Sequence, residues 1–300
     1  MRGPVHIILE KLRESDPQRR AARRSPEISH EHLLDTKRAF DSVAADYDGP
    51  IGNNALIQAM RLRLWREVAR RVAPGGRLLD LGCGTGLDAV HFAEQGYAVI
   101  ATDWSPQMVL KTGQRVGVRG LRDRVTVQHL GIQELDRLSG ERFDGIYSDL
   151  GPLNCAPKLE VVARRCAQLL NPGGALVFSV IGRTCPWEWA HYTARGHLRR
   201  ARIRKAEHAT PVGLNERTVW TRYYTPHEFA APFLPYFTLD HYEGMLLVAP
   251  PPYLIDLQSR LGRVGRALLR LDERLGRFPI AREMGDHFLM VLTKRGDGAR

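Results

Sequence analysis

The stretch Leu78-Leu79-Asp80-Leu81-Gly82-Cys83-Gly84-Thr85-Gly86 is the most informative part of this 300-residue chain. Its apolar beginning predicts a buried strand. The three glycines predict a tight loop, because glycine adopts backbone conformations that are closed to other residues. Residues 87–95 can form the helix that follows, and a second apolar run, residues 98–102, ends in Asp103. We interpret this order as the opening strand–loop–helix–strand of a nucleotide-binding α/β unit.

The details of this stretch narrow the class of ligand. The dinucleotide fingerprint is G-x-G-x-x-G, and Leu87 stands where that pattern has its third glycine. Asp80 precedes the loop, and its negative charge would repel a pyrophosphate but attract a cationic ligand. The Asp103 carboxylate can accept two hydrogen bonds from a ribose diol. S-adenosyl-L-methionine, which carries a sulfonium, an ammonium and a ribose but no phosphate, fits these features.

The sequence resembles the class I S-adenosylmethionine-dependent methyltransferases, of the type that acts on small molecules, at two motifs. Residues 79–86 are similar to the first motif of the family and residues 101–105 to its second, and the resemblance extends over about residues 35–182. It implies an α/β fold, a Rossmann-like three-layer sandwich with a mostly parallel seven-stranded sheet whose last strand is antiparallel. It also implies an enzyme that uses S-adenosyl-L-methionine as its cofactor.

The resemblance assigns cofactor contacts by position. Asp80 and the backbone of the glycine loop would hold the methionine part, Asp103 would bind the ribose hydroxyls, and Trp104 would stack on adenine. The predicted cofactor-binding residues are Tyr47, Asp80, Gly82, Cys83, Gly84, Gly86, Asp103, Trp104, Ile132, Gln133 and Ser148.

Two of these contacts depend on shorter similarities. Residues 40–48 resemble a family string that lies before the first strand and covers the cofactor, which makes Tyr47 a candidate contact. The family often has an acid near the adenine amino group, but here Gly131 takes that place. The backbone of Ile132 or the side chain of Gln133 is therefore the expected substitute.

Hydrophobic periodicity predicts the remaining elements. We expect helices at residues 32–46, 55–72, 87–95, 160–170 and 253–276, a helix that starts at the Ser105-Pro106 pair, and one that opens with the capping box Thr225–Glu228 and runs through Phe233. Strands are expected at residues 98–102, 125–130, 143–148, 175–181, 239–248 and 288–292. Alternating strands and helices imply a parallel sheet, and ligands of such sheets bind beyond the carboxyl ends of the strands.

The domain organisation follows from composition. We interpret residues 1–30 as a basic, mobile N-terminal arm and expect residues 31–300 to form the methyltransferase domain. Insertions at about 183–237 and 249–286 are interpreted as substrate caps. The second insertion has leucines at helical spacing flanked by arginines over residues 254–275. This stripe favours a core or dimer contact, with a peripheral contact to an anionic membrane as the alternative.

Charge and cysteine content limit the partners. The net charge is +11, and residues 183–225 hold nine basic and three acidic residues. An anionic substrate, nucleic acid or an acidic membrane surface would suit such a field. None of the four cysteines forms a C-x-x-C pair, which argues against a zinc site and a disulfide scaffold and fits the cytoplasm. No metal is expected, and the sequence does not indicate an oligomeric state.

The substrate side of the site is less specific. Residues 148–152 lie where the family places residues between cofactor and substrate, but they lack the Asn/Asp-Pro-Pro-Tyr signature of enzymes that methylate amides and base amino groups. His191 and Asp149 are the catalytic candidates. The substrate-binding candidates are Asn154, Trp187, Trp220, Arg222 and Tyr223.

These features predict a methyltransferase that transfers a methyl group by in-line displacement to an oxygen or nitrogen atom of a small molecule, with anionic and amphiphilic compounds as candidates. Two alternatives remain at this point. The arginine run at 199–205 suits an RNA or tRNA methyltransferase, although the absence of an RNA-binding module makes nucleic acid the less favoured partner. The other alternative is a non-catalytic module that kept the fold.

Overall fold

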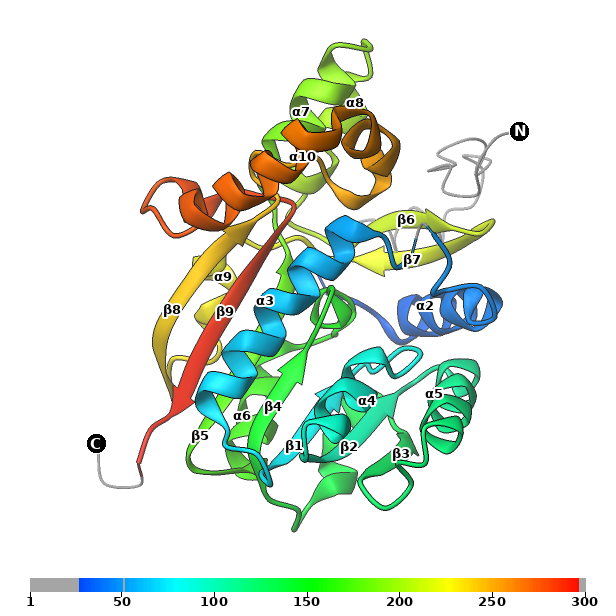
Figure 1. Ribbon diagram of the computed structural model, residues 1–300, viewed down its shortest axis with the longest axis vertical. Helices are drawn as coiled ribbons and strands as arrows, with labels where there is room; N and C mark the ends of the chain where they lie inside the picture. Colours follow the sequence, from blue (N-terminus) through cyan, green and yellow to red (C-terminus); the bar gives the residue numbers. More distant parts are fainter. Residues whose placement is uncertain (1–26, 51, 297–300) are drawn as a thin grey trace.

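A seven-stranded sheet in the order β3-β2-β1-β4-β5-β9-β8 forms the centre of the computed structural model, which describes residues 27–50 and 52–296 (Figure 1). Neighbouring strands among the first five pair in parallel, whereas β9 is antiparallel to both β5 and β8. The strands are β1 (Arg77–Leu81), β2 (Ala98–Asp103), β3 (Val125–His129), β4 (Phe143–Ser148), β5 (Leu170–Ile181), β8 (Phe237–Met245) and β9 (His287–Lys294). The predicted fold class, with one antiparallel strand in a mostly parallel sheet, is confirmed.

Helices cover both faces of this sheet and make three layers. One face carries α3 (Ala55–Arg71), α4 (Leu87–Glu94) and α5 (Pro106–Val118), and the other carries α6 (Leu159–Leu169) and the 3-10 helix η1 (Ile132–Leu138). Side chains of β1 pack against the helices on both faces of the sheet. Leu78 packs under α3 and α4, while Leu79 and Leu81 pack on the opposite face. Burial on both faces explains why the central strands are apolar runs without alternation.

Local signals in the sequence account for several element boundaries. The Ser105 hydroxyl accepts a hydrogen bond from the Met108 N–H and caps α5, as predicted. The capping box Thr225–Glu228 opens α9 (Pro226–Ala230), which ends before the predicted Phe233. Pro232 has no N–H to continue the helical hydrogen bonds.

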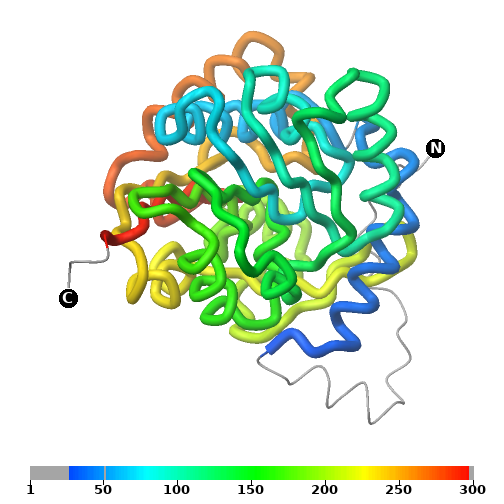
Figure 2. The backbone as a smooth tube through the Cα atoms, turned by 90° about the horizontal axis from the view of Figure 1, so that it is seen from below, coloured from blue at the N-terminus to red at the C-terminus, as the bar shows by residue number. Residues whose placement is uncertain are grey.

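The first insertion contains helical segments and a hairpin. After β5 come α7 (Pro186–Thr193), α8 (Leu198–Ala201) and the 3-10 helix η3 (Ile203–Lys205), followed by β6 (Thr210–Leu214) paired with β7 (Arg217–Thr221). The strand β7 lies beside α2 (His30–Val43), as both views show (Figure 1, Figure 2). The helix α2 corresponds to the helix predicted at residues 32–46, and both of its ends lie two to three residues closer to the N-terminus than predicted. Residues 1–26 of the predicted basic arm lie outside the described part of the chain.

The second insertion forms α10 (Ile255–Leu275) after the 3-10 helix η4 (Pro252–Leu254). Its backbone departs from helical geometry at Gly262, where φ is +50°. The leucine stripe was expected to serve as core or dimer contact. Val264 and Leu271 within it are 58% and 43% exposed in the single chain, so these two residues are not core, and a dimer contact stays a prediction. None of the helices in the described residues combines the length and apolar character that crossing a membrane demands.

Arg204 anchors the first insertion to the sheet. The sequence places it in a run of arginines that suggests an exposed basic patch, yet the structure buries its side chain. The guanidinium donates to Glu188 Oε2 at 2.8 Å, to Asp286 Oδ1 at 2.6 Å and to the carbonyl oxygens of Gly182 and Asp286. One cation thus joins α7, the end of β5 and the residue before β9.

We predict that Arg204→Ala lowers the free energy of unfolding by about 3–5 kcal/mol, because it removes the guanidinium that the buried Glu188 and Asp286 carboxylates share. Urea unfolding measures this change. The neighbouring exposed residue provides the control, since Arg202→Ala is expected to change stability by less than about 0.5 kcal/mol. Equal effects of the two substitutions would show that the buried cluster does not anchor the insertion.

Candidate functional site

The glycine loop between β1 and α4 lies at the carboxyl edge of the sheet. The N–H groups of Gly82 and Cys83 both donate to the Thr102 carbonyl at 2.9 Å, which holds the loop against the end of β2. Gly82 has φ of +81°, and a Cβ atom there would lie 2.5 Å from Pro152. A Cβ atom at Gly84, by contrast, would have Tyr47 Cε1 as its nearest neighbour at 3.9 Å, so the loop leaves open space on this side.

Asp103 connects the loop to the second strand. Its Oδ2 accepts from the Gly84 N–H at 2.9 Å and its Oδ1 accepts from the Ser105 N–H at 2.8 Å. Burial raises the pKa of Asp103 to about 6, although these two hydrogen bonds act in the opposite direction. Each carboxylate oxygen retains further acceptor capacity for a ligand hydroxyl.

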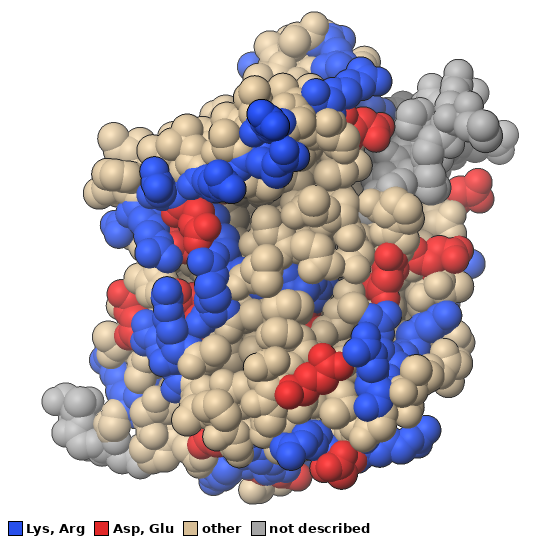
Figure 3. All heavy atoms as spheres, viewed as in Figure 1, with Lys and Arg blue, Asp and Glu red and all other residues tan. Residues whose placement is uncertain are grey.

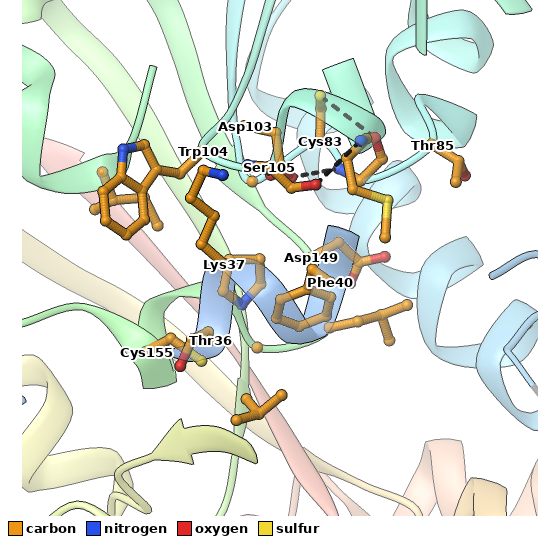
Figure 4. A pocket seen from close by; sticks show the side chains of 18 of the residues that line it. Thr36, Lys37, Phe40, Cys83, Thr85, Asp103, Trp104, Ser105, Asp149 and Cys155 are labelled. Carbon is orange, nitrogen blue, oxygen red and sulfur yellow. Dashed lines mark hydrogen bonds between the residues drawn. The ribbon is translucent and has the colours of Figure 1, made fainter. Parts of the chain in front are cut away.

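A cavity opens above these residues and is closed on the other side by α2. Figure 4 shows Thr36, Lys37 and Phe40 of α2 opposite Cys83, Asp103 and Ser105 of the sheet edge. Nine predicted residues line this cavity: Tyr47, Gly82, Cys83, Gly84, Asp103, Trp104, Ile132, Gln133 and Asp149. Segments that are far apart in the sequence therefore meet at one site, as the parallel-sheet argument requires.

Three predicted cofactor residues lie behind the cavity wall instead. Asp80 is buried and accepts from the Tyr147 hydroxyl at 3.1 Å, and burial raises the pKa of Asp80 well above its usual range. Ser148 donates to the Leu81 carbonyl at 2.8 Å, and Gly86 packs against Thr112. All three hold the strand ends and the loop in place, and no side chain among them reaches the cavity lining.

A charged cluster that the sequence analysis missed lies beside the glycine loop. Arg61 of α3 forms an ion pair with Asp88 of α4, and Asp88 also accepts from Trp65 Nε1 at 2.6 Å. Arg61, Asp88 and Asp149 all line the cavity. One feature of the sequence could have indicated this cluster. Arg61 lies on the apolar face of its helix, one turn from Ile57 and from Leu64, where burying a charge without a partner would be costly.

Asp149 is the unusual member of this cluster. Both of its carboxylate oxygens are buried and accept no hydrogen bond of ordinary geometry among the described residues. The Ser179 hydroxyl and the Leu150 N–H lie close enough to lower its pKa, but less than burial raises it. The nearest cation is Arg61, whose Nη1 lies 3.8 Å from Asp149 Oδ2. Burial and the neighbouring charge of Asp88 raise the pKa of Asp149 to about 7, against the opposing effect of Arg61. A carboxyl group with these properties can exchange a proton near neutral pH.

The predicted base and two substrate residues lie in the first insertion, away from the cavity lining. His191 is on α7, where its Nδ1 lies 3.0 Å from Arg195 Nη1, and partial burial and Arg195 lower its pKa. Trp187 donates to the Val248 carbonyl at 2.9 Å. The Tyr223 ring packs under the Arg204 guanidinium, 5.2 Å away.

The other substrate candidates also contact neighbouring chain segments. Asn154 is buried, and its amide bonds the backbone of Ile181 and the carbonyl of Arg222. The Arg222 guanidinium lies over the Tyr224 ring. Trp220 stacks on His32 with ring centroids 3.8 Å apart, because alternate residues of β7 face α2 while Val219 and Thr221 face the cavity.

Comparison with known proteins agrees with this geometry. Residues 78–174 match the family model described as a methyltransferase domain. Residues 78–174 therefore form a methyltransferase domain, as the glycine loop and Asp103 predicted.

Particular relatives cover different parts of the chain. A ubiquinone biosynthesis O-methyltransferase from Xanthomonas campestris pv. campestris (strain B100) is 34% identical over 159 residues, which is 52% of this chain and 63% of the relative. The chain thus spans less than two thirds of that protein. The structure of Burkholderia thailandensis 1,6-didemethyltoxoflavin-N1-methyltransferase with bound S-adenosylhomocysteine has a TM-score of 0.56 and 22% identity, covering 89% of this chain and 90% of that one.

A third similar structure shows that proteins with this fold do not all have names that indicate methyl transfer. The [4+2]-cyclase SpnF also has a TM-score of 0.56, with 18% identity over 91% of this chain and 97% of its own. Because its name is that of a cyclase, the shared fold alone does not determine the reaction. The reaction must be argued from the residues of the site.

We predict that Asp149→Asn stabilises the protein increasingly as pH rises. The folded wild type retains the Asp149 proton up to about pH 7, whereas the unfolded chain releases it near pH 4, so the wild type loses stability between these values. Urea unfolding should show that the stability difference between variant and wild type is larger at pH 8 than at pH 5, by up to about 2.6 kcal/mol. A pH-independent difference, matching that of exposed Asp123→Asn, would contradict the raised pKa.

Proposed function

We propose that the protein transfers a methyl group from S-adenosylmethionine to an oxygen or nitrogen atom of a small molecule, with Asp149 as general base. The observation that carries this proposal is the buried Asp149 carboxyl group, whose oxygens accept no hydrogen bond of ordinary geometry within the described residues and which lies in the same cavity as the glycine loop and Asp103. A merely inherited fold has no need of a buried carboxyl group so weakly compensated, because such a group reduces stability.

The cavity fits the cofactor at several points. Asp103 offers acceptors to the ribose hydroxyls, Trp104 offers an aromatic face to adenine, and the open space at Gly84 admits the methionine part. Arg61 is the buried cation beside the loop, and its Nε has no hydrogen-bond partner among the described residues. We therefore assign the α-carboxylate of the cofactor to Arg61. The bound cofactor supplies a methyl group activated by a sulfonium.

The chain's own contribution is to position the acceptor and remove its proton. When the acceptor oxygen or nitrogen takes up the methyl group that the cofactor would supply, the acceptor would lose its proton to an oxygen of the ionised Asp149 carboxylate. A base with a pKa near 7 suits this role because a large fraction is ionised at neutral pH. The wall formed by α2 shields one side of the cavity from solvent, and alignment of the reacting atoms can contribute about 7–11 kcal/mol in favourable cases.

The lining of the cavity favours a neutral, largely apolar acceptor over an anionic one. Leu33 and Phe40 of α2 and Val219 of β7 present apolar surface. The basic residues of the lining are Lys37 and Arg61. Lys37 pairs with Asp41 at 3.0 Å, and Arg61, which pairs with Asp88, is assigned to the cofactor carboxylate, so neither is left for an anionic acceptor. The relatives named O-methyltransferases favour oxygen as the acceptor atom.

Cofactor binding gives the first test. Calorimetric titration is expected to show micromolar affinity for S-adenosylmethionine and S-adenosylhomocysteine and none for NADH. Asp103→Ala removes charge-assisted hydrogen bonds to the ribose and should weaken binding about 10- to 100-fold, whereas exposed Asp136→Ala should not. Absence of binding by both adenosyl ligands would contradict the proposal.

Turnover gives the second test. With a panel of phenols and aromatic amines and a radiolabelled methyl group, Asp149→Asn should lower kcat by about 10²–10⁴-fold while affinity for S-adenosylhomocysteine changes little. For the wild type, kcat/KM should rise with pH through about 7, because the ionised carboxylate is the active form. A variant with unchanged turnover would remove Asp149 from the reaction but leave the cofactor assignment intact.

A further inference from the structure

The orientation of α10 is determined by its buried side. Asp272 is buried and accepts from the N–H groups of Leu246 and Val248 at 2.8 and 2.9 Å. It also lies 3.4 Å from Arg63 Nη1. Gln258 and Gly265 are buried on the same side of the helix. These contacts leave the opposite side of α10 facing outward.

The outward side of α10 combines positive charge with apolar groups. Its exposed arginines follow the helix at intervals of three or four residues: Arg260, Arg263, Arg266, Arg270 and Arg274. Exposed apolar side chains accompany them: Leu257, Val264, Leu271 and, just after the helix, Phe278 and Ile280. We call these ten residues the α10 surface. Figure 3 shows basic side chains along α10 with uncharged surface beside them.

The arginines of the α10 surface are not neutralised within the described structure. No acidic residue of the described ranges forms an ion pair with Arg263, Arg266 or Arg270, whereas Arg63 and Arg277 nearby both pair with Glu243. Val264 and Ile280 are 58% and 79% exposed. The surface therefore retains both an uncompensated positive field and apolar area open to solvent.

The positive charge and the exposed apolar area together indicate which kind of partner fits the α10 surface. A second copy placed on this surface by two-fold symmetry would bring arginine against arginine, which repels. Nucleic acid would match the charge but would leave the apolar side chains without a partner. An anionic bilayer matches both, because its headgroups attract arginine while its acyl boundary accepts apolar side chains.

We propose that the α10 surface docks the protein on an anionic lipid bilayer as a peripheral contact. The arginines bind the headgroup layer, and the apolar side chains at Val264, Leu271, Phe278 and Ile280 enter the boundary with the acyl chains. This inference rests on the surface alone and is independent of the methyl transfer proposed for the cavity.

The test is cosedimentation of the full chain with vesicles of phosphatidylcholine, with and without phosphatidylglycerol. The wild type should bind the vesicles that contain phosphatidylglycerol and should bind less at high salt. Reversing three charges by Arg263→Glu, Arg266→Glu and Arg270→Glu should weaken binding at least about tenfold. Val264→Ser with Leu271→Ser keeps the charge and should weaken binding several-fold through lost apolar contact.

A matched variant separates this surface from the general positive charge of the chain. Arg122 and Arg142 are exposed before β3 and β4, at the amino edge of the sheet, and Arg164 is exposed on α6. Reversing these three charges changes the net charge equally and should alter vesicle binding by less than about twofold. Thermal unfolding checks that every variant remains folded.

Three results would overturn the proposal. One is equal binding to vesicles with and without phosphatidylglycerol, or none to either. Another is equal loss in the two triple variants, which would assign binding to total charge. The last is a dimer in solution that dissociates when the α10 surface is altered, which would make a second copy its occupant.

Discussion

The hydrogen bond from the Gly84 N–H to the Asp103 carboxylate ties the glycine loop to the end of β2, and the arrangement of the whole site depends on it. The Thr102 carbonyl holds the first part of the same loop through Gly82 and Cys83. The loop therefore stands at a fixed height above the sheet edge, with open space at Gly84. The helix α2 borders this space on the other side, so that one cavity is lined by eight of the eleven predicted cofactor residues and by Asp149.

Buried ion clusters explain how a basic chain assembles around this cavity. Arg61 joins α3 to α4 beside the glycine loop, and Arg204 joins the first insertion to the sheet. Arg63 pairs with Glu243 of β8 and approaches Asp272 of α10, which connects three elements distant in sequence. Part of the arginine content thus serves internal structure, and the uncompensated charge gathers on surfaces such as that of α10.

The sequence predicted the sheet, its alternation with helices and the cofactor side of the cavity, because these depend on local periodicity and on one glycine motif. It did not predict the cluster of Arg61, Asp88 and Asp149, since their contact requires two helices and a strand end to meet in space. It also assigned Trp220 to the substrate, whereas strand alternation turns this side chain toward α2. Helical spacing shows which residues of α10 share a face but not which way that face points, so the sequence could not show that Val264 and Leu271 lie outside the core of this chain.

The central claim is that the glycine loop, Asp103 and Asp149 form one site for a methyl donor and its acceptor. A crystal structure of the complex with S-adenosylhomocysteine tests it most directly. The account predicts the ribose hydroxyls on Asp103, the amino-acid carboxylate on Arg61, and the sulfur facing the same space as Asp149. A ligand bound elsewhere, or one whose sulfur is separated from Asp149 by the cavity wall, would contradict it.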